Sequence, residues 1–305
     1  MQFSGATILL GVIGDPVAQA RIPGMANQWL EARGLLGRYV LAPMHVGADD
    51  LPAFIAGLRA QRNFAGAVVT MPHKTSVTAL LDALTPEARL VGAANVIRRD
   101  ADGRLTGTVL DGEGFVGGLK AQGHGVAGKR CVLFGAGGAA SAIAFALAAH
   151  GCGALHLVNR TATKAESLAQ RLRAAFPQFA VDTAVPDGAI DIAINGTRLG
   201  MQPGDALPIS ETVIARSNLV AECVIAPEIT ALLALARGQG KSIHTGVPML
   251  TAQLEHRKAI VGVRGKLAPD VVGQAEARVQ AREVGQCRHE GGFEGAHLMH
   301  HQRRA

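Results

Sequence analysis

Residues 132–140 read VLFGAGGAA, an apolar strand that runs into a glycine-rich turn and then into a helix start built from small residues. Gly135 permits a tight turn, and Gly137 lets the backbone approach a phosphate group. The free amides that open the following helix, together with the helix dipole, favour an anion at this turn. The stretch therefore predicts a Rossmann-like dinucleotide site, with cofactor contacts from Gly135, Ala136, Gly137, Gly138 and Ala139.

The second strand of this unit carries a further signal, because it is apolar at 156–158 and ends in Asn159-Arg160-Thr161. About 20 residues beyond the glycines, NAD-binding chains place an acidic residue that holds the ribose 2′-hydroxyl. This chain has Arg160 there, and Lys164 follows one helical turn later. A cationic pair favours a 2′-phosphate. We therefore expect NADP as the cofactor, with NAD as the alternative and with Asn159 and Thr161 as further contacts.

The composition favours an enzyme of the cytoplasm. A chain of 305 residues, 48% of them hydrophobic, can form two domains, and their cores must be aliphatic because only 4% of the residues are aromatic. The four cysteines lack metal-ligand spacing and the density of a disulfide scaffold, which indicates reduced thiols. The N-terminus has no basic flank, and no apolar run is long enough to span a bilayer, so we expect neither export nor membrane association.

The formal net charge of +6 raises the alternative of nucleic-acid binding. The chain lacks dense Lys/Arg runs, however, and has almost no aromatic residues to stack on bases. We therefore interpret the excess charge as a solvated surface, with anionic ligands as a second explanation. The expected partner is a small molecule, and the expected state is a monomer or a homodimer.

The first part of the chain alternates strand-like and helix-like segments, which predicts an α/β fold with a mostly parallel sheet covered by helices. We expect residues 1–110 to form a substrate-binding and catalytic domain and residues 111–246 to form an NADP-binding domain, with the active-site cleft between them. The expected strands are 6–13, 38–44, 66–70, 132–134, 156–158, 190–194, 219–222, 242–244 and one near 181, and the expected helices are 24–33, 50–59, 139–149 and one that begins after residue 111.

The last part of the chain has a different pattern. Helix-like segments at about 247–260 and 270–282 are expected to return to the first domain, which would then include about 247–283. Residues 284–305 are polar and rich in glycine and histidine, which is typical of a disordered tail. A metal site is the alternative, but clustered histidines without acidic or cysteine partners need no ligand, so we expect no metal.

Two residues have the chemistry of acid–base catalysis. The apolar strand at 66–70 runs into a proline turn and delivers Lys74 at its end. A lysine is usually a surface charge, but ligands of open α/β sheets gather beyond the carboxyl ends of strands, where this one lies. Asp111 opens the segment DGEGF, and taken alone it is also interpretable as a helix N-cap.

Eight segments, taken in chain order, resemble the shikimate/quinate dehydrogenase family across roughly residues 11–253. No single segment is decisive, but eight in the right order leave little room for chance. They are GVIGDP (11–16), VTMPHK (69–74), GAAN (92–95), DGEGF (111–115), GAGGA (135–139), NRT (159–161), NGTRLGM (195–201) and GVPMLTAQ (246–253).

The resemblance implies an NAD(P)-dependent oxidation of a ring hydroxyl, as in aromatic amino acid biosynthesis, with Lys74 and Asp111 as the catalytic pair. As hydride leaves the carbinol carbon, the hydroxyl must lose a proton, and a lysine beside a carboxylate can take it or return it. In the reduction direction, Lys74 would donate to the carbonyl oxygen and stabilise its developing negative charge. Asp111 would orient Lys74 and bond a neighbouring hydroxyl of the substrate.

The resemblance also implies the surroundings of this pair. It places Thr70, Asn95 and Gln253 around the ring hydroxyls of the substrate. It places Met201 and Met249 near the nicotinamide, and it adds Asn195, Thr197 and Gly246 to the cofactor site.

The chain departs from the family where the substrate carboxylate is held. The family usually has a Ser-x-Ser pair there, but this chain has Ala20 and Ile22. Each hydrogen bond lost to a charged group is worth about 1.5–3 kcal/mol. Arg21 compensates if its side chain points inward; as an exposed loop residue it would instead be solvated. Four further family positions are changed, with Val68 for an asparagine, Val109-Leu110 for Asn-Thr and Ile225 for a tyrosine.

The reaction type is therefore better determined than the substrate, which is shikimate, quinate or a ring with another substituent. A non-catalytic NADP(H)-binding protein, acting as a sensor or regulator, is the main alternative. The altered loop favours it, whereas the presence of both Lys74 and Asp111 counts against it. A methyltransferase is a third interpretation, but it would need a carboxylate for the ribose hydroxyls where this chain has Asn159-Arg160.

Overall fold

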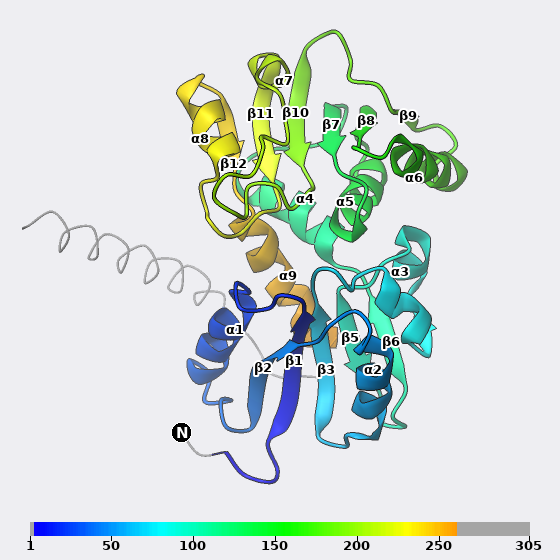
Figure 1. Ribbon diagram of the computed structural model, residues 1–305, viewed down its shortest axis with the longest axis vertical. Coiled ribbons are helices and arrows are strands. Elements are labelled where there is room, and N and C mark those ends of the chain that lie inside the picture. The colour runs from blue at the N-terminus through cyan, green and yellow to red at the C-terminus, as the bar shows by residue number, and fades with distance from the viewer. Residues whose placement is uncertain (1–2, 261–305) are drawn as a thin grey trace, which may run out of the picture. The chain divides into compact units, whose positions relative to one another are not determined.

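Residues 3–260 form two six-stranded sheets with helices packed against them (Figure 1). The computed structural model describes residues 3–260, with side chains to residue 253. The predicted α/β class, with a Rossmann-like second sheet, is confirmed. The predicted helix at 270–282 and the predicted tail at 284–305 lie outside the described residues.

The first sheet has the strand order β2-β1-β3-β5-β6-β4. β1 pairs in parallel with β2 and β3, whereas β5 runs antiparallel to β3 and β6. Its strands are β1 (Ile8–Gly14), β2 (Tyr39–His45), β3 (Phe64–Val69), β4 (Ala83–Leu84), β5 (Val96–Arg99) and β6 (Leu105–Thr108). The helices of this region are α1 (Ile22–Glu31), α2 (Leu51–Ala60), α3 (Pro86–Val91) and the 3₁₀ turn η1 (Ser76–Leu80).

Strand alternation divides the apolar side chains of this sheet between two faces. Val69 and Ile13 pack in one cluster with Ile55 of α2, and Val12 and Val68 pack in another beneath α1. The expected strands and helices of this part are found within one or two residues of their predicted ends. β5 and β6 were not predicted, because Arg98, Arg99 and the LTGT segment interrupt the apolar pattern.

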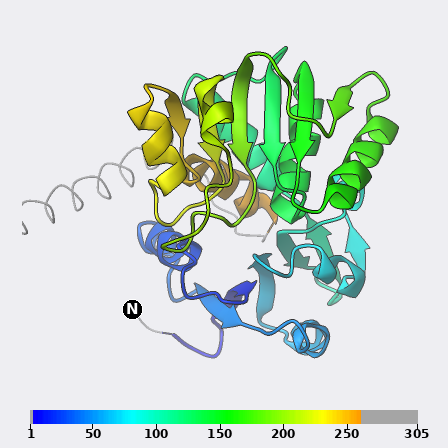
Figure 2. The same cartoon turned by 45° about the horizontal axis from the view of Figure 1, so that its top comes forward.

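The second sheet is parallel throughout, with the strand order β12-β11-β10-β7-β8-β9. The chain proceeds outward from β7 in one direction through β8 and β9, and then in the other through β10, β11 and β12, which creates the switch point where such sheets bind ligands. Figure 2 shows these strands fanned side by side. They are β7 (Arg130–Phe134), β8 (Ala154–Val158), β9 (Ala180–Asp182), β10 (Ile190–Asn195), β11 (Ser217–Glu222) and β12 (Ser242–His244).

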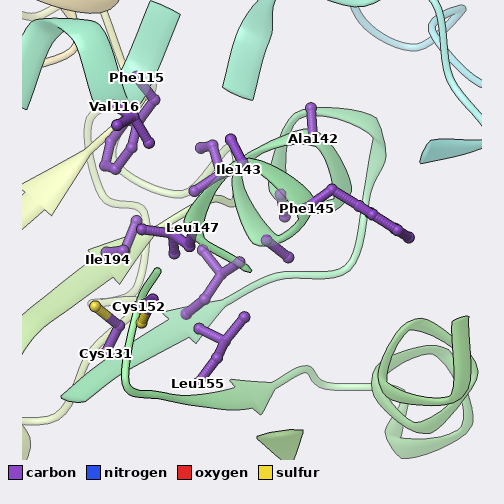
Figure 3. Packing of buried hydrophobic residues seen from close by; sticks show 14 of the residues in the cluster. Phe115, Val116, Cys131, Ala142, Ile143, Phe145, Leu147, Cys152, Leu155 and Ile194 are labelled. Atoms are coloured by element: carbon purple, nitrogen blue, oxygen red, sulfur yellow. The ribbon is translucent and has the colours of Figure 1, made fainter. Parts of the chain in front are cut away.

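Helix α5 (Gly138–Ala149) forms the centre of the largest core. Its Ile143 and Leu147 are fully buried among Phe115 of the preceding helix and Leu155 and Ile194 of the sheet (Figure 3). Burial of each such side chain stabilises the fold by about 1.5–3 kcal/mol. The other helices of this region are α4 (Asp111–Ala121), α6 (Ala162–Ala175), α7 (Glu211–Ala215) and α8 (Ala231–Gly238), and α9 (Val247–Ile260) follows β12.

Glycines let α4 lie against its neighbours. A Cβ on Gly112 would lie 2.2 Å from the carbonyl oxygen of Ala142 in α5, and one on Gly114 would lie 2.4 Å from Cγ of Gln253 in α9. Any side chain at these positions would push the helices apart. The packing thereby fixes the start of α4, where Asp111 lies. No helix within residues 3–260 has the length and apolar character needed to cross a membrane.

Candidate active site

Lys74 is held at the end of the turn that follows β3. The amide of Thr70 donates to the carbonyl of Ile13 (2.8 Å), and the His73 ring Nε2 lies 2.7 Å from the carbonyl oxygen of Val46. The carbonyl of Lys74 accepts from the amide of Ala94 (2.8 Å). These bonds fix the Lys74 backbone beside Asn95 and leave its side chain to reach across to α4.

Asp111 is the first residue of α4 and is almost fully buried. Its Oδ2 accepts from the ammonium of Lys74, and its Oδ1 accepts from Asn95 Nδ2 (2.7 Å) and Gln253 Nε2 (3.2 Å). The N-cap is Leu110, so the simple interpretation of Asp111 as a helix cap is wrong. Its carboxylate instead accepts hydrogen bonds from these three side chains.

Asn95 sets the orientation of that carboxylate. Its Oδ1 accepts from the amide of Leu110 (2.7 Å), which obliges Nδ2 to face Asp111 and the Gln253 Oε1 (3.2 Å). Asn95, Asp111 and Gln253 are at most 3% exposed, whereas 16% of the Lys74 side chain remains exposed. Lys74 is therefore the most accessible of these four side chains, and an ammonium paired with a fixed carboxylate is suited to proton transfer.

The dinucleotide turn lies against this cluster. Gly135 has φ +117°, which favours glycine, and a Cβ there would lie 3.0 Å from the carbonyl carbon and oxygen of Gly196. The Cβ position of Gly137 faces open space, as a ligand-binding turn requires, and the Cβ position of Gly138 lies 2.9 Å from Cβ of Lys74. The structure thus brings the predicted phosphate-binding turn and the predicted catalytic lysine into contact.

The predicted ribose-end residues follow β8. The amide of Gly135 donates to the carbonyl of Val158 (2.8 Å), which places the end of β8 next to the turn. Asn159 donates through Nδ2 to the carbonyl of Thr161 (2.9 Å) and shapes the start of α6. Arg160, Thr161 and Lys164 are all exposed there, so two cations are available to an anionic group at this edge.

The loop after β10 holds three further predicted cofactor residues. Asn195 is fully buried, and its Nδ2 donates to the carbonyl of Leu199 (3.0 Å) while its Oδ1 accepts from the amide (3.0 Å) and hydroxyl (2.7 Å) of Thr197. Its side chain therefore bonds within the protein and shapes the loop. Thr197 and Met201 are partly exposed.

Gly246 precedes α9 and is buried, and a Cβ there would lie 2.3 Å from the carbonyl oxygen of Val224. It therefore keeps the start of α9 close to the loop that follows β11. One buried ionisable group nearby, Glu222 at the end of β11, was missed by the sequence analysis. A carboxylate that closes an apolar strand was the available signal.

Comparison with known proteins gives a family. Residues 12–97 match the shikimate dehydrogenase substrate binding domain, and residues 119–194 match the shikimate / quinate 5-dehydrogenase model. The NADP(+)-dependent shikimate dehydrogenase of Rubrobacter xylanophilus is 38% identical over 270 residues, which cover 86% of this chain and 93% of the relative. This chain belongs to the shikimate dehydrogenase family. The predicted family and the predicted oxidoreductase class are confirmed.

Solved structures of similar proteins share the fold. The Thermus thermophilus shikimate 5-dehydrogenase, in complex with NADP(H) and shikimate, is 30% identical with a TM-score of 0.75, over 89% of this chain and 99% of that one. A 5-ketofructose reductase of Gluconobacter, in its ligand-free form, is 30% identical with a TM-score of 0.74, over 90% of this chain and all of that one. The NADP named for the Rubrobacter and Thermus enzymes agrees with the predicted cofactor.

In this member of the shikimate dehydrogenase family, the changed first loop is apolar. Ala20 and Ile22 are partly buried against the cluster that contains Val12 and Val68. Arg21 lies between them, is exposed and occupies the N-cap of α1. The two positions at which the family resemblance led us to expect serine are thus part of the packing of α1 on the first sheet.

Proposed function

We propose that this protein transfers a hydride between NADP(H) and a ring hydroxyl or ketone of a shikimate- or quinate-like compound. The observation that carries the proposal is the contact between the dinucleotide turn and the Lys74–Asp111 pair. This contact would place a bound nicotinamide and a proton donor next to each other. A non-catalytic NADP(H)-binding protein would have no need of that arrangement, and no relative supports this alternative.

Lys74 and Asp111 supply the proton transfer. NADPH supplies the hydride when it is bound. In reduction, Lys74 Nζ donates a proton to the carbonyl oxygen of the substrate and stabilises its negative charge as that charge develops. Asp111 keeps Oδ2 for Lys74 because its Oδ1 is occupied by Asn95 and Gln253. In oxidation, Lys74 takes the proton back.

The residues present fit a 2′-phosphorylated dinucleotide. Open space at the Cβ of Gly137 and the amides at the start of α5 suit a pyrophosphate, which would be held by residues 135–139. Arg160 and Lys164 would hold the 2′-phosphate, with Asn159 and Thr161 beside them. Thr197, Met201 and Gly246 would contact or flank the nicotinamide half, and Asn195 would act through its loop.

The substrate would be held by Thr70, Asn95 and Gln253 at its hydroxyls, with Arg21 as the residue able to meet a carboxylate. A neutral polyhydroxy ketone, such as the substrate named for the Gluconobacter reductase, is a second candidate. The packing of Ala20 and Ile22 against the cluster of Val12 and Val68 favours it, because no hydroxyl at these positions is left for an anion.

The organisation and setting of the protein follow from the same proposal. We propose residues 1–110 as the substrate domain, joined by α9, and residues 111–246 as the NADP domain. The hydrogen bond that Asn95 donates to Gln253 in α9 supports that return. The cytoplasmic location and the monomeric or homodimeric state stay predictions.

The experiment that tests the function is nicotinamide absorbance with NADP⁺ and with NAD⁺. Shikimate, quinate and cyclic alcohols with and without carboxylates would be offered in turn. Turnover of shikimate or quinate with NADP⁺ is the expected result. Turnover only of uncharged compounds would favour the second candidate, and no turnover despite NADPH binding would contradict the proposed enzyme.

A further inference from the structure

Glu222 is a buried acid that the reaction itself does not use. It ends β11, where it lies opposite Asn195 of β10 in the register of the parallel pair. Its Oε2 accepts from Asn195 Nδ2 (3.3 Å), and its Oε1 has no hydrogen-bond partner among the described residues. Burial raises its pKa to about 7, although the side chains of Thr230 and Asn195 act in the opposite direction.

The groups that face Glu222 offer no positive charge. They are the Asn195 amide from β10, the Thr230 side chain at the N-cap of α8 and the next residue along the chain, Cys223, which follows β11. Burial raises the pKa of the Cys223 thiol to about 12, so this neighbour is neutral. An ionised Glu222 would therefore be a buried carboxylate without a cation among the described residues, which is strongly unfavourable.

Asn195 transmits the state of Glu222 to the loop at 196–201. The Nδ2 that faces Glu222 also donates to the carbonyl of Leu199 (3.0 Å), and the Oδ1 on the other side accepts twice from Thr197. The Thr197 hydroxyl in turn accepts from the amide of Leu199 (3.1 Å). A rotation of the Asn195 amide would break several of these bonds together.

This loop lies directly on the dinucleotide turn. A Cβ on Gly135 would lie 3.0 Å from the carbonyl of Gly196 and 3.2 Å from Cγ2 of Thr197. A shift of the loop by a few tenths of an ångström would therefore change the shape of the turn. The path from Glu222 to the turn contains only Asn195 and the loop that it holds.

We propose that Glu222 is a positioning residue of the cofactor site, which in its neutral form holds the loop at 196–201 against the dinucleotide turn. The inference rests on the proposed binding of NADP(H). Loss of the Glu222 proton leaves an unpaired charge beside Asn195, rearranges the loop and weakens cofactor binding. The affinity for NADPH is then sensitive to pH through a group that does not touch the cofactor.

The test is the dissociation constant of NADPH, measured by its fluorescence from pH 6.0 to 8.5 in the wild type and in Glu222→Gln. The glutamine has the shape of the neutral acid and cannot ionise. We expect wild-type affinity to fall roughly tenfold over this range, and the variant to match the wild type at pH 6.0 within about twofold and to stay flat. Asp187→Asn, which removes an exposed carboxylate from the loop between β9 and β10, should keep the wild-type profile.

A parallel fall in the wild type and in Glu222→Gln would overturn the proposal, because another group would then be titrating. So would a variant that binds tenfold more weakly already at pH 6.0. Wild-type protein that binds no NADPH at any pH would overturn the proposed cofactor and this inference together. Thermal unfolding of the free protein checks that the variant is folded at each pH.

Discussion

Gly138 and Lys74 are in direct contact, since a Cβ on Gly138 would lie only 2.9 Å from the Cβ of Lys74. The first residue of α5 and the last residue of the β3 turn therefore limit one another's position. The proposed phosphate-binding turn and the proposed proton donor thus meet at a single glycine, which suggests a paired test with its neighbour Gly137.

Gly138→Ala should displace Lys74 and lower kcat by about tenfold, because the added methyl overlaps the Lys74 side chain, and overpacking of this kind costs about 1–3 kcal/mol. Gly137→Ala should leave thermal stability unchanged, since its methyl meets nothing in the protein, but should weaken NADPH binding. Steady-state kinetics, NADPH titration and thermal unfolding of both variants provide the check. Equal effects of the two substitutions on NADPH affinity would contradict this division of roles.

Lys74→Ala should reduce turnover by about 10²–10⁴-fold, the usual contribution of a positioned acid–base group, while NADPH still binds. The NADPH dissociation constant and kcat, measured on the same preparation, separate the two effects. Normal turnover would remove Lys74 from the chemistry. Asn95→Ala is the companion change: it should give a smaller loss, because Gln253 still donates to Oδ1 of Asp111.

Arg160→Ala should weaken NADPH much more than NADH. A hydrogen-bonded charge pair of this kind contributes about 1.5–3 kcal/mol, which corresponds to a loss of roughly 10- to 100-fold for the phosphorylated cofactor only. Dissociation constants of both cofactors provide the measurement. Equal weakening of NADPH and NADH would refute the assignment of Arg160 to the 2′-phosphate.

The double substitution Ala20→Ser and Ile22→Ser restores the hydroxyls that the family usually has in this loop. We expect kcat/KM for shikimate to rise about tenfold or more, since hydrogen bonds to a carboxylate become available. Quinate should respond in the same direction, and an uncharged cyclic alcohol should not. A loss of stability is expected as well, because Ile22 packs against the cluster beneath α1. An unchanged kcat/KM for shikimate in a folded variant would mean that Arg21 or another group already holds the carboxylate.

The buried His244 ring should make the fold sensitive to acid. It is fully buried, its Nδ1 lies 2.6 Å from Gln122 Oε1, and its Nε2 has no partner among the described residues. Burial lowers its pKa from 6.5 to about 4. Because the folded-state pKa is depressed, the contribution of the neutral ring to stability is present above pH 6.5 and is lost as the pH falls toward 4, by about 3 kcal/mol.

Thermal unfolding between pH 7 and pH 4.5 measures this loss. His244→Gln should show a shallower fall in Tm than the wild type, from a lower starting value. His45→Gln, which removes an exposed ring, should follow the wild-type slope. Identical slopes in all three proteins would exclude His244 as the source.

Much of the fold was predictable because its strands are short apolar runs that end in turns or helix starts. β7, the glycine turn and α5 follow directly from residues 132–149. β5 and β6 did not, since their pairing depends on contacts with β3 and β4 rather than on their own pattern. Local sequence does not record such tertiary pairing.

Some residues of the candidate site were likewise predictable from the sequence, and others were not. Lys74, Asp111 and Asn95 were predicted by resemblance, and the structure brings them together with Gln253, more than 140 residues further along the chain than Asp111. The indirect position of Asn195 was not predictable, because a buried asparagine and a ligand-binding asparagine have the same sequence signature. Glu222 was missed for a related reason: its position at the end of an apolar strand was the one signal in the sequence, and its burial in the structure is what separates it from a surface acid.

The Lys74–Asp111–Asn95–Gln253 cluster has one further consequence. Its members come from the turn after β3, the loop before β5 and the helices α4 and α9, and none comes from the loop between β1 and α1. The proposed proton transfer and the proposed contact with a substrate carboxylate are thereby separable in this molecule. The β1–α1 loop can diverge, through mutation or by design, to admit new compounds while the proton-transfer machinery is inherited unaltered.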